Sequence, residues 1–600
     1  MRVSLSSLPA RAKTYCVSVD RLDGGLNLFE EESRLDINQT SEMKNLIWRD
    51  GALASRKGQR QVCRPAGKGL AAYERYFGGR AIFHIGSCLY AVDPENGGKS
   101  CIYSGLEQIP GTFFLYGGSL YYKTRGAYVV INEKLEARPV EPYTPVILIN
   151  ADPKSGSGDL YQPENRLSER KTVWYNADGG TEYQLPVKGA QVVEITVDGE
   201  KVDGYGYDKA TGVVSFLSAP PVSDPPVNNT VRISYALENP EAWASIMDCT
   251  MAEVYGGESR LCIVMAGSTA QPDGYFWNGS HAAMDAGYFP MEHYNLVGDS
   301  ISGFGRQQGM LVVFSRGSLG RASFSLVEVD GRERISMPYV AINSVIGCDM
   351  PRSIQTVENN LLFCNSRLGV FRLQSTSAAS ENELQHISRN VDGTERRAGL
   401  LAAAAENCAS MNDGCRYWLA VGGKVFLWDH SISSANKPSW FLFTNVDAAA
   451  FVRDGDSVCY LARDGRICAF YDGFFDFGAA IEREYRLPPQ AFGGYERLKD
   501  VDKVVLTLSS TTDSLLRLDY ISDYGRRTEP VPLRAYSWRL APRNISYRML
   551  DSLGWSRSFV RMPACRHVRH FAMRMYNNEA GQDLTLLSVR IFFRYRAYER

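Results

Sequence analysis

The sequence predicts an all-β protein, and three observations support this prediction. Apolar runs are short and end in Asn, Gly or Ser, as residues 353–373 show with three such runs separated by two polar turns. Long stretches with a 3.6-residue apolar period are absent, so no long helix is expected. The succession of strand, turn and strand recurs at residues 117–130, 308–319, 417–428 and 456–470. Repeated meanders of short strands are typical of a β-propeller, in which radial repetition leaves few exposed sheet edges.

Length and composition exclude several classes of protein. A chain of 600 residues should form more than one domain, and its 44% hydrophobic content can fill several cores. The net charge of −1 gives no global field that would attract nucleic acid or a membrane. No apolar run is long enough to span a bilayer, and residues 1–16 lack the apolar centre of a secretion signal. The thirteen cysteines are scattered without a CxxC pair, so we expect mostly reduced, buried residues in a protein made in a cytoplasm.

Residues 1–142 are predicted to form an N-terminal arm and the first propeller blades. Within the arm, residues 41–46 have a polar, helix-like pattern, and Asp50-Gly51 predicts the turn of a hairpin. Residues 81–92 and 111–131 then have the pattern of further hairpins.

Residues 143–238 differ in texture and are predicted to form an inserted β-sandwich. A Gly/Ser-rich turn at 155–158 is followed by a strand at 192–197 that turns through Asp198-Gly199. A proline-rich turn at 220–226 then leads to a strand at 231–235. Hairpins precede and follow this region, so we expect an insertion at a loop of the larger fold.

Residues 239–485 are predicted to form the remaining blades, and residues 486–600 a C-terminal β-sandwich. Beyond residue 485 the strands become longer and alternate apolar with polar residues, at 503–508, 515–520, 570–576 and 584–595. Such alternation is what a half-buried antiparallel sheet requires.

The usual signatures of catalysis are missing from the sequence. The phosphate-binding loop, the HExxH pattern and the GxSxG pattern do not occur. Residues 410–414 resemble the Ser-x-Asp-x-Gly box of sialidase propellers only weakly, and a hairpin turn at Asp413-Gly414 explains them better. Trp428-Asp429 matches the WD dipeptide without its Gly-His partner or its repeat, so a core Trp at the end of a strand is the better explanation.

The remaining candidates for site chemistry are small groups of polar residues. Cys565, His567 and His570 lie close together in the sequence, but zinc would need a fourth ligand that is not nearby. Two carboxylate pairs, Asp472 with Asp476 and Glu482 with Glu484, have the residue types of glycoside hydrolysis. Their separation in space cannot be read from the sequence. We therefore predict no catalytic, cofactor-binding or metal-binding residue and no enzymatic activity.

Three stretches together resemble a known family. The first is Gly24-Gly25-Leu26-Asn27 with residues 45–58, the second is residues 285–290 leading into 301–304, and the third is residues 346–351 with 353–373 and 387–390. They resemble structural proteins of tailed bacteriophages, in particular the propeller-containing tail nozzle, tail-tube and stabilisation proteins. The inserted region, through residues 158–165 and 183–186, resembles one carried by some members from phages of Gram-positive hosts.

The resemblance implies a virion component of the tail or neck, assembled in the cytoplasm of a bacterial host. It implies a hexameric ring that contacts a portal, an adaptor or other tail proteins and through which the genomic DNA passes. It carries over no catalytic residue and no cofactor. Because each neutralised phosphate would add affinity for DNA, we expect the lumen of such a ring to be neutral or acidic.

Charge is distributed unevenly, which suggests a candidate for the ring interface. Residues 531–600 contain 13 Lys and Arg against 4 Asp and Glu, whereas residues 1–530 contain 53 against 63. A ring needs two different complementary faces, and an acidic body with a basic C-terminal sandwich could supply them. On this hypothesis, charge reversal of Arg566, Arg569 and Arg574 weakens ring formation in a salt-sensitive way. The alternative is that the basic segment is only a solvated face of the sheet.

The competing function is a propeller-type lectin or glycosidase that acts on polysaccharide of the host surface. The mass of the pure protein and a screen for glycan binding or hydrolysis distinguish the two, since a monomer that binds or cleaves polysaccharide favours the lectin or glycosidase. A bacterial surface adhesin is disfavoured by the missing secretion signal.

Overall fold

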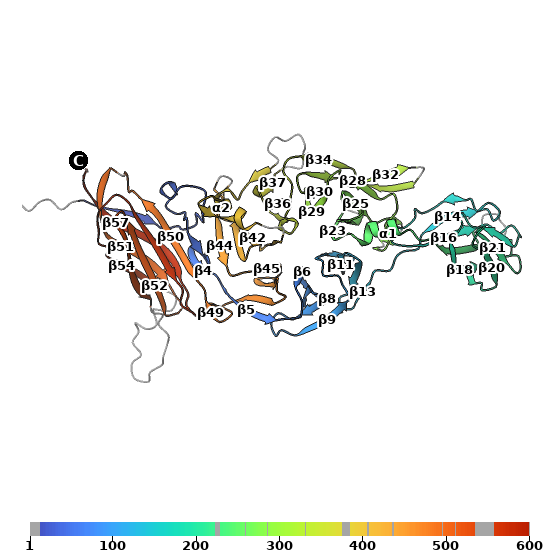
Figure 1. The fold of residues 1–600 in the computed structure, drawn as a ribbon, viewed down its shortest axis with the longest axis horizontal. Coiled ribbons are helices and arrows are strands. Elements are labelled where there is room, and N and C mark those ends of the chain that lie inside the picture. Colours follow the sequence, from blue (N-terminus) through green and yellow to red (C-terminus); the bar gives the residue numbers. More distant parts are fainter. Residues whose placement is uncertain are drawn as a thin grey trace, which may run out of the picture.

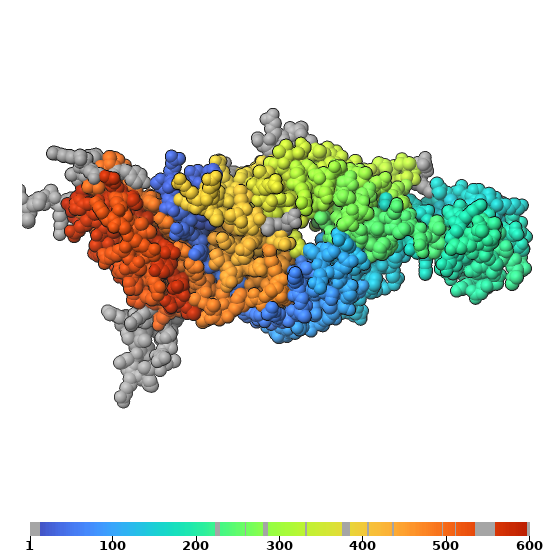
Figure 2. Space-filling view, viewed as in Figure 1, coloured from blue at the N-terminus to red at the C-terminus, as the bar shows by residue number. Residues whose placement is uncertain are grey.

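The protein is all-β, as predicted, with a propeller interrupted by one β-sandwich and followed by another. The computed structural model describes residues 13–222, 229–257, 260–281, 283–284, 286–329, 332–374, 384–404, 407–434, 437–494, 496–510, 512–533 and 557–598. Figure 1 shows an elongated molecule with the propeller in the middle, the inserted sandwich at one end and the C-terminal sandwich at the other. In Figure 2 the three bodies form a continuous row of packed atoms.

The propeller has seven blades in the described part of the chain, each a meander of four strands. From the innermost strand outward, blade 1 is β6 (Gly69–Phe77), β7 (Arg80–Ile85), β8 (Cys88–Val92), β9 (Lys99–Ser104); blade 2 is β10 (Thr112–Tyr116), β11 (Ser119–Thr124), β12 (Ala127–Ile131), β13 (Ala137–Pro139); and blade 3 is β23 (Met251–Gly256), β24 (Leu261–Ala266), β25 (Gly274–Trp277), β28 (Tyr294–Leu296). Blade 4 is β29 (Ile301–Gln307), β30 (Met310–Ser315), β31 (Leu319–Ala322), β34 (Tyr339–Asn343), and blade 5 is β35 (Gln355–Val357), β36 (Asn360–Asn365), β37 (Gly369–Leu373), β38 (Leu384–His386). Blade 6 is β41 (Ala409–Asn412), β42 (Arg416–Val421), β43 (Lys424–Asp429), β44 (Trp440–Thr444), and blade 7 is β45 (Ala448–Asp454), β46 (Ser457–Ala462), β47 (Ile467–Tyr471), β5 (Gly58–Cys63).

Contacts between the innermost strands show that the propeller is closed. Each innermost strand contacts the next in chain order, and β45 of blade 7 contacts β6 of blade 1. Blade 7 takes its fourth strand, β5, from the N-terminal part of the chain, and β5 pairs antiparallel with β47. The two ends of the propeller are therefore held together by strand pairing, which removes an open sheet edge.

Short elements extend the blades. Blade 4 carries an extra hairpin, β32 (Ser325–Val329) and β33 (Arg332–Ser336), and blade 7 is extended by β48 (Phe475–Asp476) and β49 (Ala479–Ala480). Elsewhere on the propeller lie β26 (Ser280–His281), β27 (Ala283–Met284), η2 (Pro351–Ser353), α2 (Arg389–Asp392), β39 (Gly393–Thr394), β40 (Arg397–Ala398) and α3 (Leu400–Ala403).

The inserted sandwich lies between blades 2 and 3. Its larger sheet has the order β15-β14-β16-β22-β18-β19 and its smaller sheet the order β17-β21-β20. The strands are β14 (Val146–Ala151), β15 (Asp159–Leu160), β16 (Arg170–Tyr175), β17 (Glu182–Gln184), β18 (Gln191–Val197), β19 (Glu200–Lys201), β20 (Tyr205–Asp208), β21 (Val213–Phe216) and β22 (Val231–Ala236). Side chains of both sheets, such as Tyr175, Tyr183 and Ile233, form a core that contains no residue of the propeller. Helix α1 (Pro240–Met247) then leads back into blade 3.

The C-terminal sandwich is built from both ends of the chain. One sheet has the order β3-β4-β57-β51-β54, with β1 on β57 and β55 on β51, and the other has the order β2-β50-β56-β52-β53. The N-terminal contribution is β1 (Thr14–Val19), β2 (Met43–Lys44), β3 (Leu46–Arg49) and β4 (Ala52–Ser55), with the short helix η1 (Glu32–Arg34) between β1 and β2. The C-terminal strands are β50 (Arg483–Gln490), β51 (Arg497–Ser509), β52 (Ser514–Ser522), β53 (Gly525–Leu533), β54 (Arg557–Arg561), β55 (Cys565–Val568), β56 (Phe571–Asn577) and β57 (Thr585–Tyr598).

In the arm, the structure confirms the predicted hairpin and corrects the helix-like pattern. The hairpin at Asp50-Gly51 is confirmed, because β3 pairs with β4 around these residues and both have positive φ angles, 53° and 77°. The helix-like pattern of residues 41–46 was misleading. These residues form β2 and the start of β3, interrupted at Asn45 with φ of 57°, because β2 pairs with β50 of the sandwich. In the described residues, no helix is long and apolar enough to cross a membrane.

Candidate functional site

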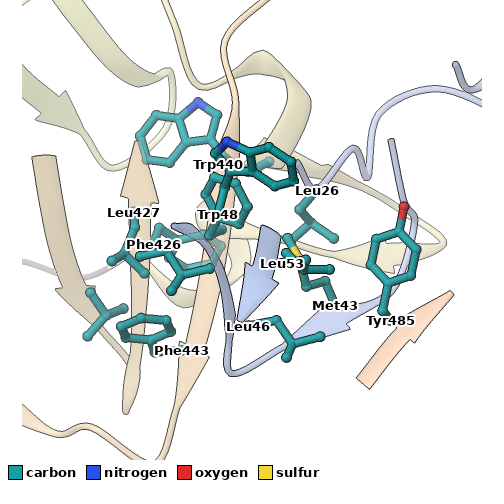
Figure 3. Packing of buried hydrophobic residues seen from close by; sticks show 14 of the residues in the cluster. Leu26, Met43, Leu46, Trp48, Leu53, Phe426, Leu427, Trp440, Phe443 and Tyr485 are labelled. Atoms are coloured by element: carbon teal, nitrogen blue, oxygen red, sulfur yellow. The ribbon is translucent and has the colours of Figure 1, made fainter. Parts of the chain in front are cut away.

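The N-terminal segment makes polar and apolar contacts where the propeller meets the C-terminal sandwich. We call this region the joint and define it as residues 24–28 and 43–58 together with β43, β44, β50 and residues 473–476. Figure 3 shows its apolar part, in which Trp48 and Leu53 of the N-terminal segment lie among Phe426, Trp440 and Tyr485. These side chains are at most 8% exposed and belong to one core cluster that runs from the propeller into the sandwich. Because this cluster spans both bodies, the propeller and the sandwich share a core. Burial of a large apolar side chain in such a core stabilises the fold by about 1.5 to 3 kcal/mol.

Asn45 connects three elements with a single side chain that is 1% exposed. Its Nδ2 donates to Thr444 Oγ1 at 2.8 Å and to the Glu482 carbonyl at 2.7 Å. Its Oδ1 accepts from the Thr444 amide at 2.8 Å and from Arg56 Nε at 2.7 Å. All of its side-chain hydrogen-bonding capacity on both ends is therefore used to hold blade 6 and the start of the sandwich against the arm.

Arg56 carries a buried charge at the centre of the joint. Its side chain is 1% exposed and forms a two-pronged ion pair with Asp476, with Nη1 donating to Oδ1 at 2.9 Å and Nη2 donating to Oδ2. The same guanidinium donates to the carbonyls of Lys57 and Thr444. Such a pair is costly to remove from water, and only this complete set of partners makes its burial tolerable.

Close backbone contact requires glycine at two positions of the joint. Gly25 has φ of 72°, and a Cβ there would lie 2.6 Å from the Trp440 carbonyl oxygen. The next residue, Leu26, donates its amide to that same carbonyl at 2.7 Å. At Gly58 a Cβ would lie 2.5 Å from the Phe475 carbonyl oxygen, so this position also admits no side chain without displacement.

A second, smaller contact region joins the inserted sandwich to blade 3. Asn165 Nδ2 donates to the carbonyls of Tyr143 and Gly287, each at 2.8 Å, and its Oδ1 accepts from the Phe289 amide at 2.9 Å. Arg166 donates to the Met291 carbonyl at 2.7 Å and to Ser245 of α1 at 3.2 Å. The insertion is therefore tied to the propeller through buried polar contacts in addition to its two chain connections.

Parts of each stretch that carries the family resemblance lie in these contact regions, while residues 301–304 and most of residues 353–373 form strands of the propeller blades. The first forms the arm side of the joint, and the third meets it, since Leu28 donates to the Asn390 carbonyl and Trp440 Nε1 donates to the Ile387 carbonyl. The second supplies Gly287 and Phe289 to the contact with the insertion, while its Asp285 lies outside the described residues.

The candidate carboxylate pairs are held by cations. Asp476 binds Arg56 in the joint, whereas Asp472 is exposed and binds Lys57 at 2.9 Å. Glu482 and Glu484 both bind Lys44, at 2.8 and 3.2 Å, and Glu484 also binds Arg574. Burial opposes ionisation of Glu484, but Arg574 and Lys44 outweigh it and lower the pKa of this carboxyl below its ordinary value. Each of the four carboxylates is therefore paired with a Lys or Arg side chain.

The two weak propeller matches have structural explanations, as expected. Asp413 lies in the turn between β41 and β42, where it accepts from the amides of Cys415 and Arg416 and from Trp418 Nε1. Trp428 is 4% exposed at the end of β43, and Asp429 pairs with Arg416 at 2.8 Å.

The Cys565, His567 and His570 group is spread over β55 and the turn after it. His570 pairs with Asp523 through Nδ1, His567 is exposed, and the Cys565 thiol lies 3.6 Å from the Pro563 carbonyl. Within the described residues, no three His, Cys, Asp or Glu side chains are placed to hold a metal ion.

The three candidate interface arginines differ in their surroundings. Arg574 lies in β56 and pairs with Glu484, with Asp519 at 3.7 Å and with Glu42 at 3.8 Å, so its charge is used inside the sandwich. Arg566 and Arg569 are exposed near β55. Other arginines of the basic segment are also paired within the molecule, namely Arg561 with Glu529, Arg590 with Asp20, Arg594 with Asp502 and Arg596 with Asp500. The charge surplus of the sequence is therefore reduced in the fold by acids of the arm and of the sandwich itself.

The residues of the joint could not be assigned from the sequence, although Asn45 and Arg56 fall in the first resembling stretch. The sequence offers Asp476 as a candidate only together with Asp472, but Asp472 is exposed and binds Lys57. One feature of the sequence could have indicated the ion pair: Arg56 directly follows the apolar strand Ala52-Leu53-Ala54-Ser55. A charged side chain at such a buried position needs a counter-ion.

Comparisons with known proteins add little to this description. No protein-family model matches the chain, and no curated protein matches its sequence. Among solved structures, the AfRom2 CNH domain has a TM-score of 0.34 at 7% identity and covers 69% of this chain and 99% of its own. The WD40 domain of Neurospora crassa Pan2 has a TM-score of 0.34 at 6% identity and covers 71% of this chain and 97% of its own. The computationally designed Ika8 protein has a TM-score of 0.32 at 9% identity, covering 70% of this chain and 100% of its own. At these TM-scores the likenesses carry no argument about function.

Proposed function

We propose that the protein is a structural subunit of a tailed bacteriophage, a component of the tail nozzle or neck that forms a hexameric ring around the path of the ejected DNA. The proposal joins the resemblance of the three stretches to the way the fold uses them. Its neighbours in the particle would be a portal, an adaptor or other tail proteins.

One observation carries the proposal: parts of the resembling stretches supply contacts between the β bodies. Asn45, Arg56 and Gly25 connect the arm to the propeller and the sandwich, and Gly287 and Phe289 receive the insertion. In an enzyme, the catalytic residues gather around a substrate cavity. A structural subunit instead depends on the residues at the contacts between its parts.

The charged groups of the joint are consistent with a mechanical role. Arg56 and Asp476 neutralise each other, and the four carboxylates considered for catalysis all bind cations. The buried Arg56–Asp476 pair resists changes of geometry, because separating it leaves an unpaired charge in the interior.

Localisation in a particle tests the proposal directly. Antibodies raised against the purified full chain are expected to decorate the tail or neck of particles from the phage that encodes it, seen by immunogold electron microscopy. Decoration of head surface alone, or absence of the chain from purified particles by mass spectrometry, contradicts the proposal.

A further inference from the structure

Blade 1 carries one cysteine on each of its two outer strands. Cys88 is the first residue of β8 and is partly buried, and Cys101 lies in β9 and is exposed. Both are free thiols in the structure. In blade 1, β9 is the outermost strand and pairs only with β8. Figure 1 shows the two strands together at the lower edge of the propeller.

Strand pairing places both cysteines on one face of the blade. Leu89 and Ala91 belong to the core between blades 1 and 2, whereas Tyr90 packs against the core between blades 1 and 7. Because side chains alternate along a strand, Cys88 lies on the same face as Tyr90. Cys101 is the partner of Tyr90 across the ladder, and partners in a ladder share a face. The two cysteines therefore both lie on the face toward blade 7.

A β-bulge in β9 makes the two cysteines neighbours on this face. The register shifts at Ile102, which is the extra residue of the bulged strand. Ile102 and Tyr103 both pack against the core between blades 1 and 2. On the opposite face, Cys101 is therefore followed directly by Ser104, which is the residue paired with Cys88. The two cysteines are diagonal neighbours across the ladder.

The two thiols also interact with each other. Burial raises the pKa of the Cys101 thiol, and a hydrogen bond with the Cys88 thiol raises it further. Burial likewise raises the pKa of the Tyr90 hydroxyl, and both thiols act on it in the same direction. The Cys101 thiol lies 3.4 Å from the Tyr103 carbonyl oxygen. Thiols that hydrogen-bond across neighbouring strands are close enough for side-chain rotation to join their sulfur atoms.

We propose that Cys88 and Cys101 are a modification site, at which an oxidant of the glutathione disulfide class joins the two thiols in a disulfide bond. The bond fastens the outermost strand β9 to the rest of blade 1. The proposal does not depend on the proposed function, because both cysteines lie in one blade of a single chain.

The reaction consists of two exchange steps. The exposed Cys101, as its thiolate, attacks one sulfur of glutathione disulfide, and one glutathione leaves as its thiolate. The Cys88 thiolate then attacks the Cys101 sulfur of this mixed disulfide, and the second glutathione leaves. Two protein thiols are thereby oxidised, their two protons pass through the solvent to the departing thiolates, and one glutathione disulfide is reduced to two glutathione molecules.

Peptide mapping of the full chain tests the proposal. The folded protein is incubated with glutathione disulfide at about pH 8.5, where a sizeable part of an exposed thiol is ionised, and free thiols are then alkylated. Digestion with trypsin, without reduction, separates the two cysteines, because cleavage after Lys99 places Cys88 in peptide 81–99 and Cys101 in peptide 100–123. These two peptides are expected to appear joined, with a mass that is lower than their sum by two hydrogen atoms.

Two other cysteines define the results that overturn the proposal. Cys16 is exposed and reports that the oxidant has reacted, since it should take up one glutathione. Unlinked peptides 81–99 and 100–123 in protein whose Cys16 is modified contradict the proposal. Cys63 of β5 packs against the same core as Tyr90 but belongs to blade 7. A link from Cys101 to the Cys63 peptide, residues 61–64, would also contradict it.

Variants and hydrogen exchange test the pairing and its effect. Cys101→Ser is expected to remove the link, whereas the matched control Cys63→Ser should retain it at the yield of the parent. A peptide 81–99 that remains linked in Cys101→Ser contradicts the pairing. Oxidation should slow amide hydrogen exchange in β9 about tenfold, and reduction with dithiothreitol should reverse this. Exchange in β9 that is unchanged by formation of the link would show that the bond does not fasten this strand.

Discussion

In the joint, substitution of Arg56 or Asp476 should lower the free energy of unfolding the most. Both side chains are at most 3% exposed, so Arg56→Met leaves the Asp476 carboxylate without its counter-ion in the interior. We expect a loss of about 3 to 5 kcal/mol in the free energy of unfolding, measured by urea denaturation. The matched control is Lys57→Met, which removes the exposed pair with Asp472 and should cost less than about 1 kcal/mol. Equal losses of unfolding free energy in the two variants would show that the buried ion pair stabilises the joint no more than the exposed pair does.

His84 should make the propeller sensitive to acid. It is fully buried between blades 1 and 2, where its Nδ1 and the Tyr122 hydroxyl share a hydrogen bond of 2.6 Å. Burial lowers its pKa from 6.5 to about 4, with the charge of Arg352 acting in the same direction. The unfolded chain therefore binds more protons than the folded one between these values, and stability falls as the pH drops from 6.5 through 4. The loss attributable to His84 should reach up to about 3 kcal/mol.

The comparison that isolates this effect uses His84→Asn, whose amide can still hydrogen-bond to Tyr122 but does not titrate in this range. Urea midpoints of the two proteins should converge as the pH falls from 6.5 to 4. Parallel curves over this window would rule out a buried, neutral His84.

The candidate interface arginines need to be tested separately because they differ in environment. Arg574→Glu places a carboxylate against Glu484 and Asp519 and should destabilise the sandwich itself. Arg566→Glu and Arg569→Glu change exposed positions, so folding should be retained. If these two arginines lie in a ring interface, their double variant should form fewer rings than the parent at low salt in sedimentation velocity. Unchanged assembly would leave the basic segment as a solvated face.

At the scale of elements, closure of the propeller depends on β5. A Cβ at Gly58, the first residue of β5, would press on the carbonyl oxygens of Phe475 and Gly473 at 2.5 and 2.7 Å. We expect Gly58→Ala to cost about 1 to 3 kcal/mol of unfolding free energy. Gly317→Ala is the control, because a Cβ there meets no atom within 4 Å and its backbone is not left-handed. A Gly58→Ala variant as stable as this control would mean that β5 moves without cost.

Elements with local signals could be predicted from the sequence, and elements defined by distant partners could not. The hairpins at Asp50-Gly51 and Asp198-Gly199 follow from turn residues that adopt positive φ angles. By contrast, β2 contains only two residues, and it is a strand because β50, far along the chain, pairs with Met43 and Lys44. For the same reason the sequence does not reveal that the N-terminal arm completes the C-terminal sandwich. In the site, the types of residue were visible, but the pairing of Arg56 with Asp476 depends on this same distant packing.

At the scale of the whole molecule, the two sandwiches should differ in their ability to fold when expressed alone. The insertion has a core of its own, so residues 143–238 expressed alone should fold and unfold cooperatively. Residues 483–600 alone lack β1 and β4 beside β57 and β2 beside β50, and should not fold. Near-ultraviolet circular dichroism with thermal melting distinguishes the outcomes. A cooperative melt of residues 483–600 would contradict the two-ended construction of the sandwich.

The central claim is that this chain is an assembly subunit, and its mass in solution tests that most directly. Sedimentation velocity of the purified full chain should reveal a closed oligomer of six times 66.8 kDa, with no larger open-ended series, because a ring closes on itself. A protein that remains monomeric at every concentration and salt tested, and that cleaves polysaccharide, would contradict the account.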